Sequence, residues 1–252
     1  MTQQTFIKQF QQYLNNNSDK HRAKQEKAYL YSDLKHYGVS IWQLRKFFSQ
    51  HQKDLKNLSK PKTLSLVKRL WNRASHEDRT ATLFILNLHK EKLTINDMSL
   101  IEKLMRESRG WALLDSLIIP LMPEIINRDK KAYDFLKKWI KDNDFWVRRS
   151  ALLAQLLFFR QNKNGNQQLF FALAKSQFDE SWIDKVYKNT LDRQRARFFI
   201  RKAIGWVLRE MSQKQPKVVL EFLKKYKSQM SGLSFREASR KLPPRMKKLL
   251  NR

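Results

Sequence analysis

Apolar residues recur at helical spacing along nearly the whole chain, whereas the alternating pattern of a half-buried strand is scarce. Only five glycines and six prolines interrupt the 252 residues, so helices joined by short polar turns are expected. The pattern predicts helices near residues 3–16, 20–36, 40–51, 61–73, 76–89, 95–107, 110–127, 129–141, 145–160, 167–177, 181–190, 195–213, 216–228 and 234–241. Many helices of similar length are typical of stacked helical pairs, so we expect an all-α helical-repeat solenoid, an α-α superhelix.

The segment 145–160 carries apolar residues on two sides of its expected helix. One stripe holds Phe145, Leu152 and Leu156, and the other holds Val147, Ala151, Ala154 and Phe158. A helix with two apolar stripes packs on two sides, as a layered array requires. We therefore expect one domain over residues 1–252, with the basic segment 241–252 as a loose tail.

Three serines are expected to begin helices. The pairs that resemble capping boxes are Ser40 with Gln43, Ser75 with Asp78, and Ser234 with Glu237. In each pair the hydroxyl would accept a hydrogen bond from a backbone N–H of the first helical turn.

The charge of the chain favours a polyanionic partner. Lysine and arginine total 52 against 23 acidic residues, which gives a net charge of +29. Each phosphate that such a surface neutralises releases condensed counterions and adds affinity. Nucleic acid, a membrane headgroup layer and an acidic protein all satisfy this charge, so the charge alone does not select DNA.

The residue types that commonly hold metals and cofactors are poorly represented. The absence of cysteine excludes disulfides, thiolate zinc sites and iron–sulfur clusters. None of the five histidines is paired with another at i,i+4 spacing. We therefore expect no metal and no cofactor.

No segment of the sequence resembles a membrane anchor. The N-terminus lacks the apolar stretch of a signal peptide. The most apolar segment, residues 113–126, is interrupted by Asp115, Pro120, Pro123 and Glu124 and is too short to span a bilayer. We expect a cytoplasmic monomer with no membrane contact.

Arg149 breaks the apolar pattern of its helix. At helical spacing it falls between Phe145, Leu152 and Leu156, where a guanidinium needs a carboxylate or phosphate partner. One interpretation is an internal salt bridge between repeats, and the other is a contact with a bound phosphate. Arg148 points elsewhere on the helical wheel, beside Gln155, and is expected to be solvated.

Asp115 is a second break in the pattern. It is the one charged residue in the apolar stretch 111–119, and Trp111 lies one turn earlier on the same face. The carboxylate could simply accept hydrogen bonds from a neighbouring helix end. Alternatively, a carboxylate beside an indole could serve a reaction.

Trp206 is the third break. Its helix has a regular apolar stripe that includes Ile200, Ile204 and Val207, yet Trp206 projects from nearly the opposite side. That side also carries Phe199, Lys202 and Arg209. Trp206 either packs against a second helical layer or contacts bases or sugars in a phosphate-binding groove.

These three breaks fall in segments that resemble the AlkD-type alkylpurine DNA glycosylases of the DNA alkylation repair family. The resembling segments are FFIRKAIGWVLRE at 198–210, LSFREA at 233–238, DNDFWVRRSALL at 142–153 and WALLDS at 111–116. Weaker likenesses extend the resemblance over most of residues 20–240, and the match at 198–210 is specific to this family.

The resemblance implies a curved stack of HEAT-like helical pairs with a basic concave face that holds double-stranded DNA. It also implies hydrolysis of the N-glycosidic bond of alkylated, cationic purines such as N3-methyladenine and N7-methylguanine, without flipping of the base into a pocket. By position, Asp115 is the expected catalytic carboxylate, and Trp111 and Trp206 are the aromatics beside the sugar. The residues expected to bind DNA are Arg149, Arg148, Lys202, Arg209 and Tyr29.

One position departs from the family pattern. The family often has an aspartate directly after the first tryptophan, and this chain has Ala112 there. That difference leaves open a non-catalytic DNA-binding or damage-sensing protein. A helical-repeat protein scaffold or an RNA-binding module also remains compatible with the basic, all-helical sequence.

Overall fold

The computed structural model describes residues 2–108, 110–163 and 165–250. Within these ranges the fold is all-helical, and the single isolated β-bridge joins Lys35 to Ser75. The expected all-α helical-repeat fold is confirmed. The chain divides into two compact units, residues 1–117 and 118–252.

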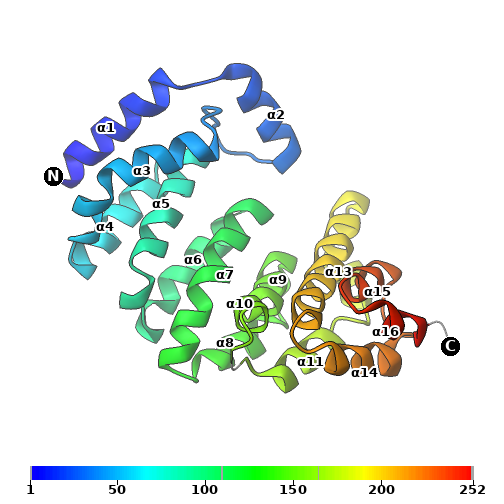
Figure 1. Ribbon diagram of the computed structural model, residues 1–252. Helices are drawn as coiled ribbons and strands as arrows, with labels where there is room; N and C mark the ends of the chain where they lie inside the picture. The colour runs from blue at the N-terminus through cyan, green and yellow to red at the C-terminus, as the bar shows by residue number, and fades with distance from the viewer. Residues whose placement is uncertain (1, 109, 164, 251–252) are drawn as a thin grey trace. The chain divides into compact units, whose positions relative to one another are not determined.

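The first unit holds the N-terminal helices (Figure 1). They are α1 (Gln3–Asn16), α2 (Lys20–Leu30), α3 (Ile41–Lys56), α4 (Lys60–Trp71), α5 (His76–Leu88), the short 3-10 turns η1 (Lys90–Lys92) and η2 (Ile95–Asp97), α6 (Met98–Glu107), and the start of α7 (Trp111–Arg128). Phe6 and Phe10 of α1 pack against Phe47 and Phe48 of α3 with ring centroids 5.2–5.8 Å apart. This aromatic cluster is the core of the N-terminal helical pair.

Two of the three expected helix starts are confirmed in the first unit. Ser40 and Gln43 form a complete capping box at α3, and the Ser75 hydroxyl accepts a hydrogen bond from the backbone N–H of Asp78 at α5. The third start differs, because α15 of the second unit is capped by Ser231 rather than by Ser234. Ser234 instead donates its hydroxyl hydrogen to the carbonyl oxygen of Arg201.

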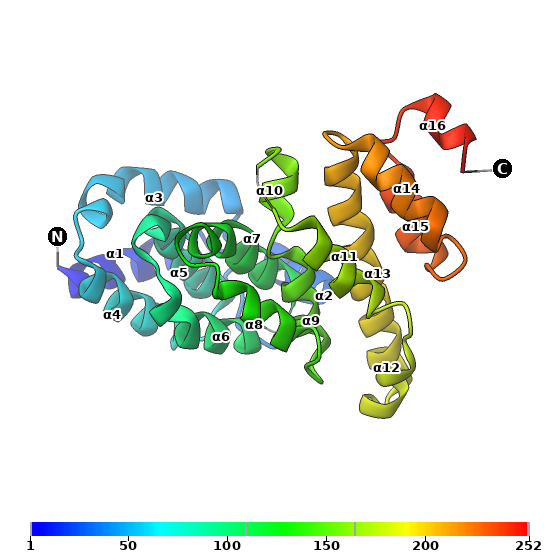
Figure 2. The ribbon, with the colours of Figure 1, turned by 90° about the horizontal axis from the view of Figure 1, so that it is seen from below.

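The second unit follows from the last part of α7. Its helices are α8 (Ala132–Trp139), α9 (Phe145–Leu153), α10 (Leu156–Arg160), α11 (Gln167–Lys175), α12 (Ser181–Val186), α13 (Thr190–Ser212), α14 (Pro216–Tyr226), α15 (Gly232–Ser239) and α16 (Pro244–Lys248). The long helix α13 packs against α9 and α15. Figure 2 shows α12 at the N-terminal end of α13 and α14 at its C-terminal end.

Gly205 allows α13 and α15 to approach closely. A Cβ atom at this position would lie 2.6 Å from the Cβ of Glu237 and 3.0 Å from the carbonyl oxygen of Ser234. Any larger residue would force the two helices apart. The glycine of the segment 198–210 is therefore required by packing.

The segment 145–160 of the second unit differs from expectation. The helix expected over 145–160 is interrupted at Ala154 and Gln155. The buried Gln155 side chain accepts from the N–H of Asn166 (2.6 Å) and donates to its carbonyl oxygen (3.3 Å), so it holds the neighbouring chain. Both apolar stripes of the segment are nevertheless buried, as the two-sided packing requires.

The described part of the segment 241–252 contains a short helix. Pro244 begins helix α16, and Leu250 is 4% exposed. The Lys227 ammonium donates to the carbonyl oxygen of Leu250 at 2.6 Å. These contacts attach the described part of the tail to α14 and the turn that follows it.

Helix α7 is apolar but does not have the character of a membrane span. It contains Pro120 and Pro123 and carries Asp115 near its start. Among the described residues, no helix is both long enough and apolar enough to cross a membrane.

Candidate functional site

Asp115, Trp111 and Tyr29, which we call the Trp111 cluster, lie in the first unit. Trp111 is the first residue of α7, and Asp115 follows one helical turn later. Asp115 is 9% exposed, and Leu114 and Leu117 of the same helix are fully buried. The ring of Tyr29 meets the Trp111 indole edge to face, with centroids 6.0 Å apart and planes at 88°. The structure thus brings Tyr29 and Trp111 together, although they are distant in sequence. The resemblance assigns both to one site.

Tyr29 is carried by a lobe formed by residues 19–38, which we call the α2 lobe. The N–H of Asp19 donates to the carbonyl oxygen of Tyr37 at 2.8 Å, which closes the base of the lobe. Gly38 sits beside this closure with a φ of +78°, and a Cβ there would lie 2.1 Å from the carbonyl oxygen of Asp19. None of the α2 side chains, all of which the structure describes, is buried. Tyr29 is therefore 69% exposed and available to a ligand.

Arg149 lies inside the second unit, on α9. It is 4% exposed, and one of its N–H groups donates to the carbonyl oxygen of Phe199 on α13 at 2.8 Å. Its guanidinium carbon also lies 5.5 Å from the centroid of the Phe199 ring. Arg149 is thus buried, as its apolar stripe predicts, but this donated N–H goes to a backbone carbonyl oxygen rather than to a carboxylate or a phosphate. These contacts connect α9 to α13.

Arg148 is buried, so the expectation that it is solvated is wrong. Its side chain lies 3.5 Å from the centroid of the Trp182 ring, and the residue is 8% exposed. Its guanidinium donates to the carbonyl oxygen of Asp142 and to Oε1 of Gln177 (3.1 Å). Burial lowers the pKa of this guanidinium from its usual value. Arg148 therefore connects the residues that follow α8 to the segments that follow α11.

Trp206 lies on α13 between two cations, and we call Lys202, Trp206 and Arg209 the Trp206 face. Trp206 itself is half-buried. Both cations pair with Glu237 of α15: Lys202 lies 2.7 Å from Oε1, and Arg209 contacts Oε2. The hydrogen bond from Lys202 holds the pKa of Glu237 below its usual value, assisted by the charge of Arg209.

Glu237 is not among the site residues expected from the sequence, where its spacing from Ser234 indicates a helix start. The segment 233–238 resembles the family, and that signal could have identified it. Its carboxylate pairs with both cations, and Nε of Arg209 also lies 4.0 Å from Oε1 of Glu210. The Trp206 face thus combines an indole with two cations whose side chains are held by ion pairs to Glu237.

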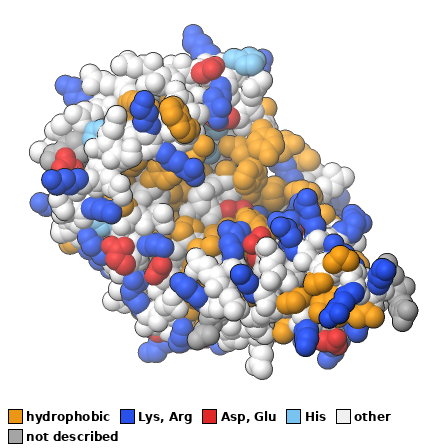
Figure 3. All heavy atoms as spheres, in the orientation of Figure 1, with side chains coloured by type: hydrophobic (Ala, Val, Ile, Leu, Met, Phe, Trp, Pro, Cys, Tyr) orange, Lys and Arg blue, Asp and Glu red, His pale blue; other side chains and the backbone are white. Residues whose placement is uncertain are grey.

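The basic residues that accompany these clusters are widely distributed. Figure 3 shows lysine and arginine side chains spread over the face in view, where acidic side chains are fewer. Several arginines are already paired within the second unit, for example Arg201 with Glu180 at 2.6 Å. The excess of 52 basic over 23 acidic residues still leaves most cations without a matching carboxylate in the chain.

Chemically, the Trp111 cluster offers a carboxylate that is largely withdrawn from water and an electron-rich indole nearby. A carboxylate in such a place interacts more strongly with a developing positive charge than one in bulk water does. The indole face also favours a cationic or polarised group. These groups suit a reaction in which positive charge develops on the substrate.

Comparisons with known proteins agree with this description. The family model for the DNA alkylation repair enzymes matches residues 10–242 of the chain. A solved structure described as a predicted DNA alkylation repair enzyme from Enterococcus faecalis superposes with a TM-score of 0.73 at 19% sequence identity. The likeness covers 90% of this chain and 98% of that chain, and at this identity it concerns the fold. A comparison with curated proteins finds no match.

Proposed function

Because this chain belongs to the DNA alkylation repair enzyme family, we propose that it hydrolyses the N-glycosidic bond of cationic alkylated purines in double-stranded DNA. The expected substrates are N3-methyladenine and N7-methylguanine. The observation that carries the proposal is the placement of Asp115, a 9% exposed carboxylate, one turn from Trp111 on α7. The products would be a free purine and an abasic deoxyribose.

Asp115 supplies the negative charge that this reaction needs. An alkylated purine already carries a positive charge, so it leaves with the electrons of the glycosidic bond and needs no strong general acid. Positive charge then develops on the deoxyribose, where a nearby carboxylate stabilises it. The same carboxylate orients a water molecule for attack at C1′ and receives its proton on the way to solvent.

Each of the two tryptophans is proposed to contact DNA from its own unit. The indole faces of Trp111 and Trp206 can each contact a polarised deoxyribose, since aromatic faces attract cationic groups. Tyr29, which is 69% exposed and in edge contact with Trp111, extends the aromatic surface of the first unit. Lys202 and Arg209 are proposed to contact the phosphates beside Trp206.

Arg149 has a different proposed role. At 4% exposure and with an N–H donated to the carbonyl oxygen of Phe199, it positions α13 relative to α9. It thereby supports the Trp206 face, which lies on α13, and acts on DNA binding only through that helix.

The test is single-turnover release of N7-methylguanine from an alkylated duplex, in which slow product dissociation cannot hide the chemical step. We expect the wild-type protein to release free base and Asp115→Asn to be slower by about 10²–10³-fold, as for loss of one electrostatic stabiliser. The matched control is Asp134→Asn, which removes a carboxylate with a 68% exposed side chain on α8 and should leave the rate unchanged. Equal rates for wild type and Asp115→Asn would refute the assigned mechanism.

Ala112 favours one alternative, a DNA-binding or damage-sensing protein without glycosylase activity. It occupies the position at which the family often has a second aspartate beside the tryptophan. In that case the wild-type protein would bind alkylated duplex and release no purine from it. Restoring the family residue with Ala112→Asp would then be the informative variant.

A further inference from the structure

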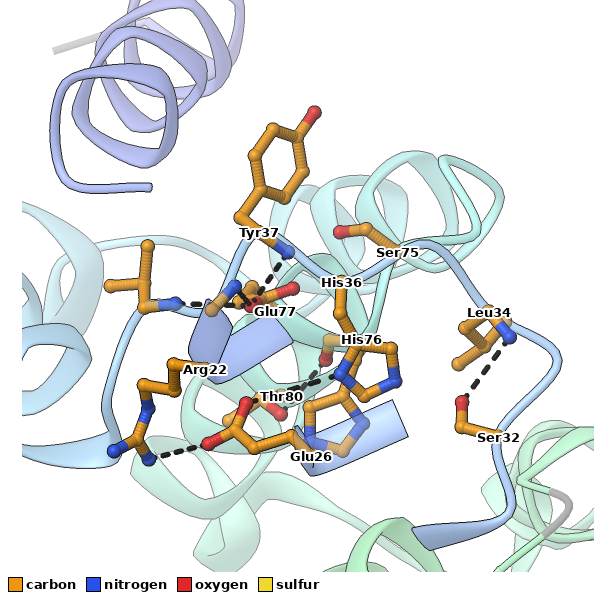
Figure 4. Close-up of polar contacts among 12 residues, drawn as sticks. Arg22, Glu26, Ser32, Leu34, His36, Tyr37, Ser75, His76, Glu77 and Thr80 are labelled. Carbon is orange, nitrogen blue, oxygen red and sulfur yellow. Dashed lines mark hydrogen bonds and ion pairs between the residues drawn. The ribbon is translucent and has the colours of Figure 1, made fainter. Parts of the chain in front are cut away.

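Three ionisable residues from separate parts of the first unit converge beside the base of the α2 lobe. They are Glu26 of α2, His36 of the segment that follows it, and Glu77 of α5 (Figure 4). One potential ligand atom from each lies within 4.8 Å of the other two. Nδ1 of His36 is 3.9 Å from Oε2 of Glu26, too far for a direct hydrogen bond.

Two of these residues are buried with polar atoms that nothing in the described chain satisfies. The His36 side chain is 1% exposed, and neither of its ring nitrogens has a hydrogen-bond partner among the described residues. Glu77 is 0% exposed, and its Oε2 also lacks a partner there. Buried polar groups in folded proteins are nearly always satisfied, so three such atoms in one cluster point to a further ligand.

The carboxylates of the cluster are held in place through their other oxygens. Oε1 of Glu77 accepts hydrogen bonds from the backbone N–H groups of Tyr37 (3.0 Å), Gly38 (2.8 Å) and Val39 (3.3 Å). Oε1 of Glu26 accepts from the guanidinium of Arg22. Metal-binding carboxylates are oriented by such outer contacts, which leave the remaining oxygen to the ion.

We propose that Glu26, His36 and Glu77 bind a divalent transition-metal cation such as Zn²⁺. One imidazole nitrogen and two carboxylate oxygens form a mixed ligand set that suits Zn²⁺ and its neighbours better than Mg²⁺ or Ca²⁺, which prefer oxygen alone. The two negative charges balance the charge of the ion. His76, whose ring stacks on His36 at 4.7 Å and 9°, covers one face of the ligating imidazole.

The bound ion would have a structural role. Its three ligands come from α2, from the segment after α2 and from α5, so the ion connects the α2 lobe to the body of the first unit. Apolar burial contributes little to this connection, because none of the described α2 side chains is buried. The ion therefore adds a link from α2 to α5 beside the edge contact of Tyr29 with Trp111. The site does not depend on the proposed glycosylase activity.

Calorimetric titration of the chelator-treated full chain with Zn²⁺ tests the proposal. Substitution by Co²⁺ then gives the ligand number and geometry from the absorption spectrum. We expect one equivalent of tight binding, with affinity reduced by at least about 10–100-fold in Glu26→Gln, His36→Gln and Glu77→Gln. Glu26→Gln is the variant least able to disturb folding, because its side chain is 24% exposed and glutamine can still accept from Arg22.

His21→Gln is the matched control, since it removes an exposed histidine from the same helix. It should bind Zn²⁺ as the wild type does. Loss of binding in this control, or binding that is unchanged in all three ligand variants, would place the ion elsewhere and overturn the proposal. Absence of stoichiometric binding by the wild type would overturn it as well.

Hydrogen exchange gives a second readout that needs no enzyme activity. Zn²⁺ should slow exchange of the α2 backbone amides in the wild type and in His21→Gln, but not in Glu26→Gln. The amides of α14, in the second unit, serve as the internal reference and should not change. Equal protection of α2 with and without Zn²⁺ would contradict the structural role.

Discussion

Replacing Arg148 with methionine should destabilise the second unit and leave DNA affinity almost unchanged. Methionine fills a similar volume but removes the charge and every donor. The substitution removes the Arg148 donor from the part-buried carbonyl oxygen of Asp142 and from the buried Oε1 of Gln177, and it removes the contact at 3.5 Å with the Trp182 ring.

The size of the effect follows from these contacts. A hydrogen bond from a charged donor contributes about 1.5–3 kcal/mol, and a desolvated cation–π contact about 2 kcal/mol. Relief of the desolvation penalty of the guanidinium and the apolar packing of methionine offset part of this loss. The net cost should be about 3 kcal/mol, toward the upper end of typical single substitutions. For a unit of this size that cost corresponds to a fall in melting temperature of roughly 6–12 °C.

Thermal melts followed by circular dichroism measure the stability. Fluorescence anisotropy with an undamaged duplex measures the DNA affinity separately. Lys217→Met is the control, because it removes one positive charge from an exposed position on α14. Its duplex affinity should match that of Arg148→Met, and its melting temperature should match that of the wild type. If Arg148→Met kept wild-type stability and bound DNA at least about tenfold more weakly, Arg148 would be a phosphate contact and the packing role would be refuted.

Further substitutions and conditions test other parts of the structure. Gly205→Val should cost about 2–3 kcal/mol in urea unfolding, because a Cβ there already meets Glu237 at 2.6 Å; an unchanged midpoint would show that α13 and α15 separate freely. The pKa of Glu237 is lowered by Lys202, so its ion pairs stabilise above the unfolded pKa and are lost as pH falls through the lower folded value. The melting difference between wild type and Glu237→Gln should therefore shrink below about pH 4, and a constant difference from pH 7 downward would contradict the assignment. Affinity for undamaged duplex should fall by about 10³–10⁵ between 50 and 200 mM salt if 6–10 phosphates are neutralised, whereas a flat salt dependence would exclude a largely electrostatic grip.

Helical periodicity was sufficient to predict the architecture, since each expected helix has a counterpart. The boundaries of some helices were not predicted. The break at Gln155 arises because its side chain hydrogen-bonds the backbone of Asn166, and periodicity contains no information about such a contact. Likewise, the helix expected to reach residue 36 ends at Leu30, where Tyr31 adopts the left-handed conformation at a φ of 50°.

The candidate site was predicted in part. Asp115 and Arg149 were identified because a charge interrupts an apolar stripe, and both are buried. Arg148 was misjudged because it lies in the polar gap between the two stripes of its helix. That gap is covered by Gln177 and Trp182, which come from later segments that a helical wheel does not include.

The expectation that the chain binds no metal rested on the absence of cysteine and on the absence of histidine pairs at i,i+4 spacing. Glu26, His36 and Glu77 belong to three different segments, so no search for i,i+4 pairs could find them. Their proximity depends on the turn at Gly38 and on the start of α5. The proposed cation site is therefore a property of the tertiary structure alone.

The closure between Asp19 and Tyr37 has a consequence for how this chain can vary. Because both ends of the α2 lobe meet at one hydrogen-bonded base, its length and sequence can change without moving the helices on either side. Related chains could lengthen, shorten or replace the lobe and keep the α1–α3 core, with its Phe6 and Phe47 contacts, intact. The α2 lobe can thus vary independently of the α1–α3 core, and with it the exposed aromatic side chain that the first unit presents.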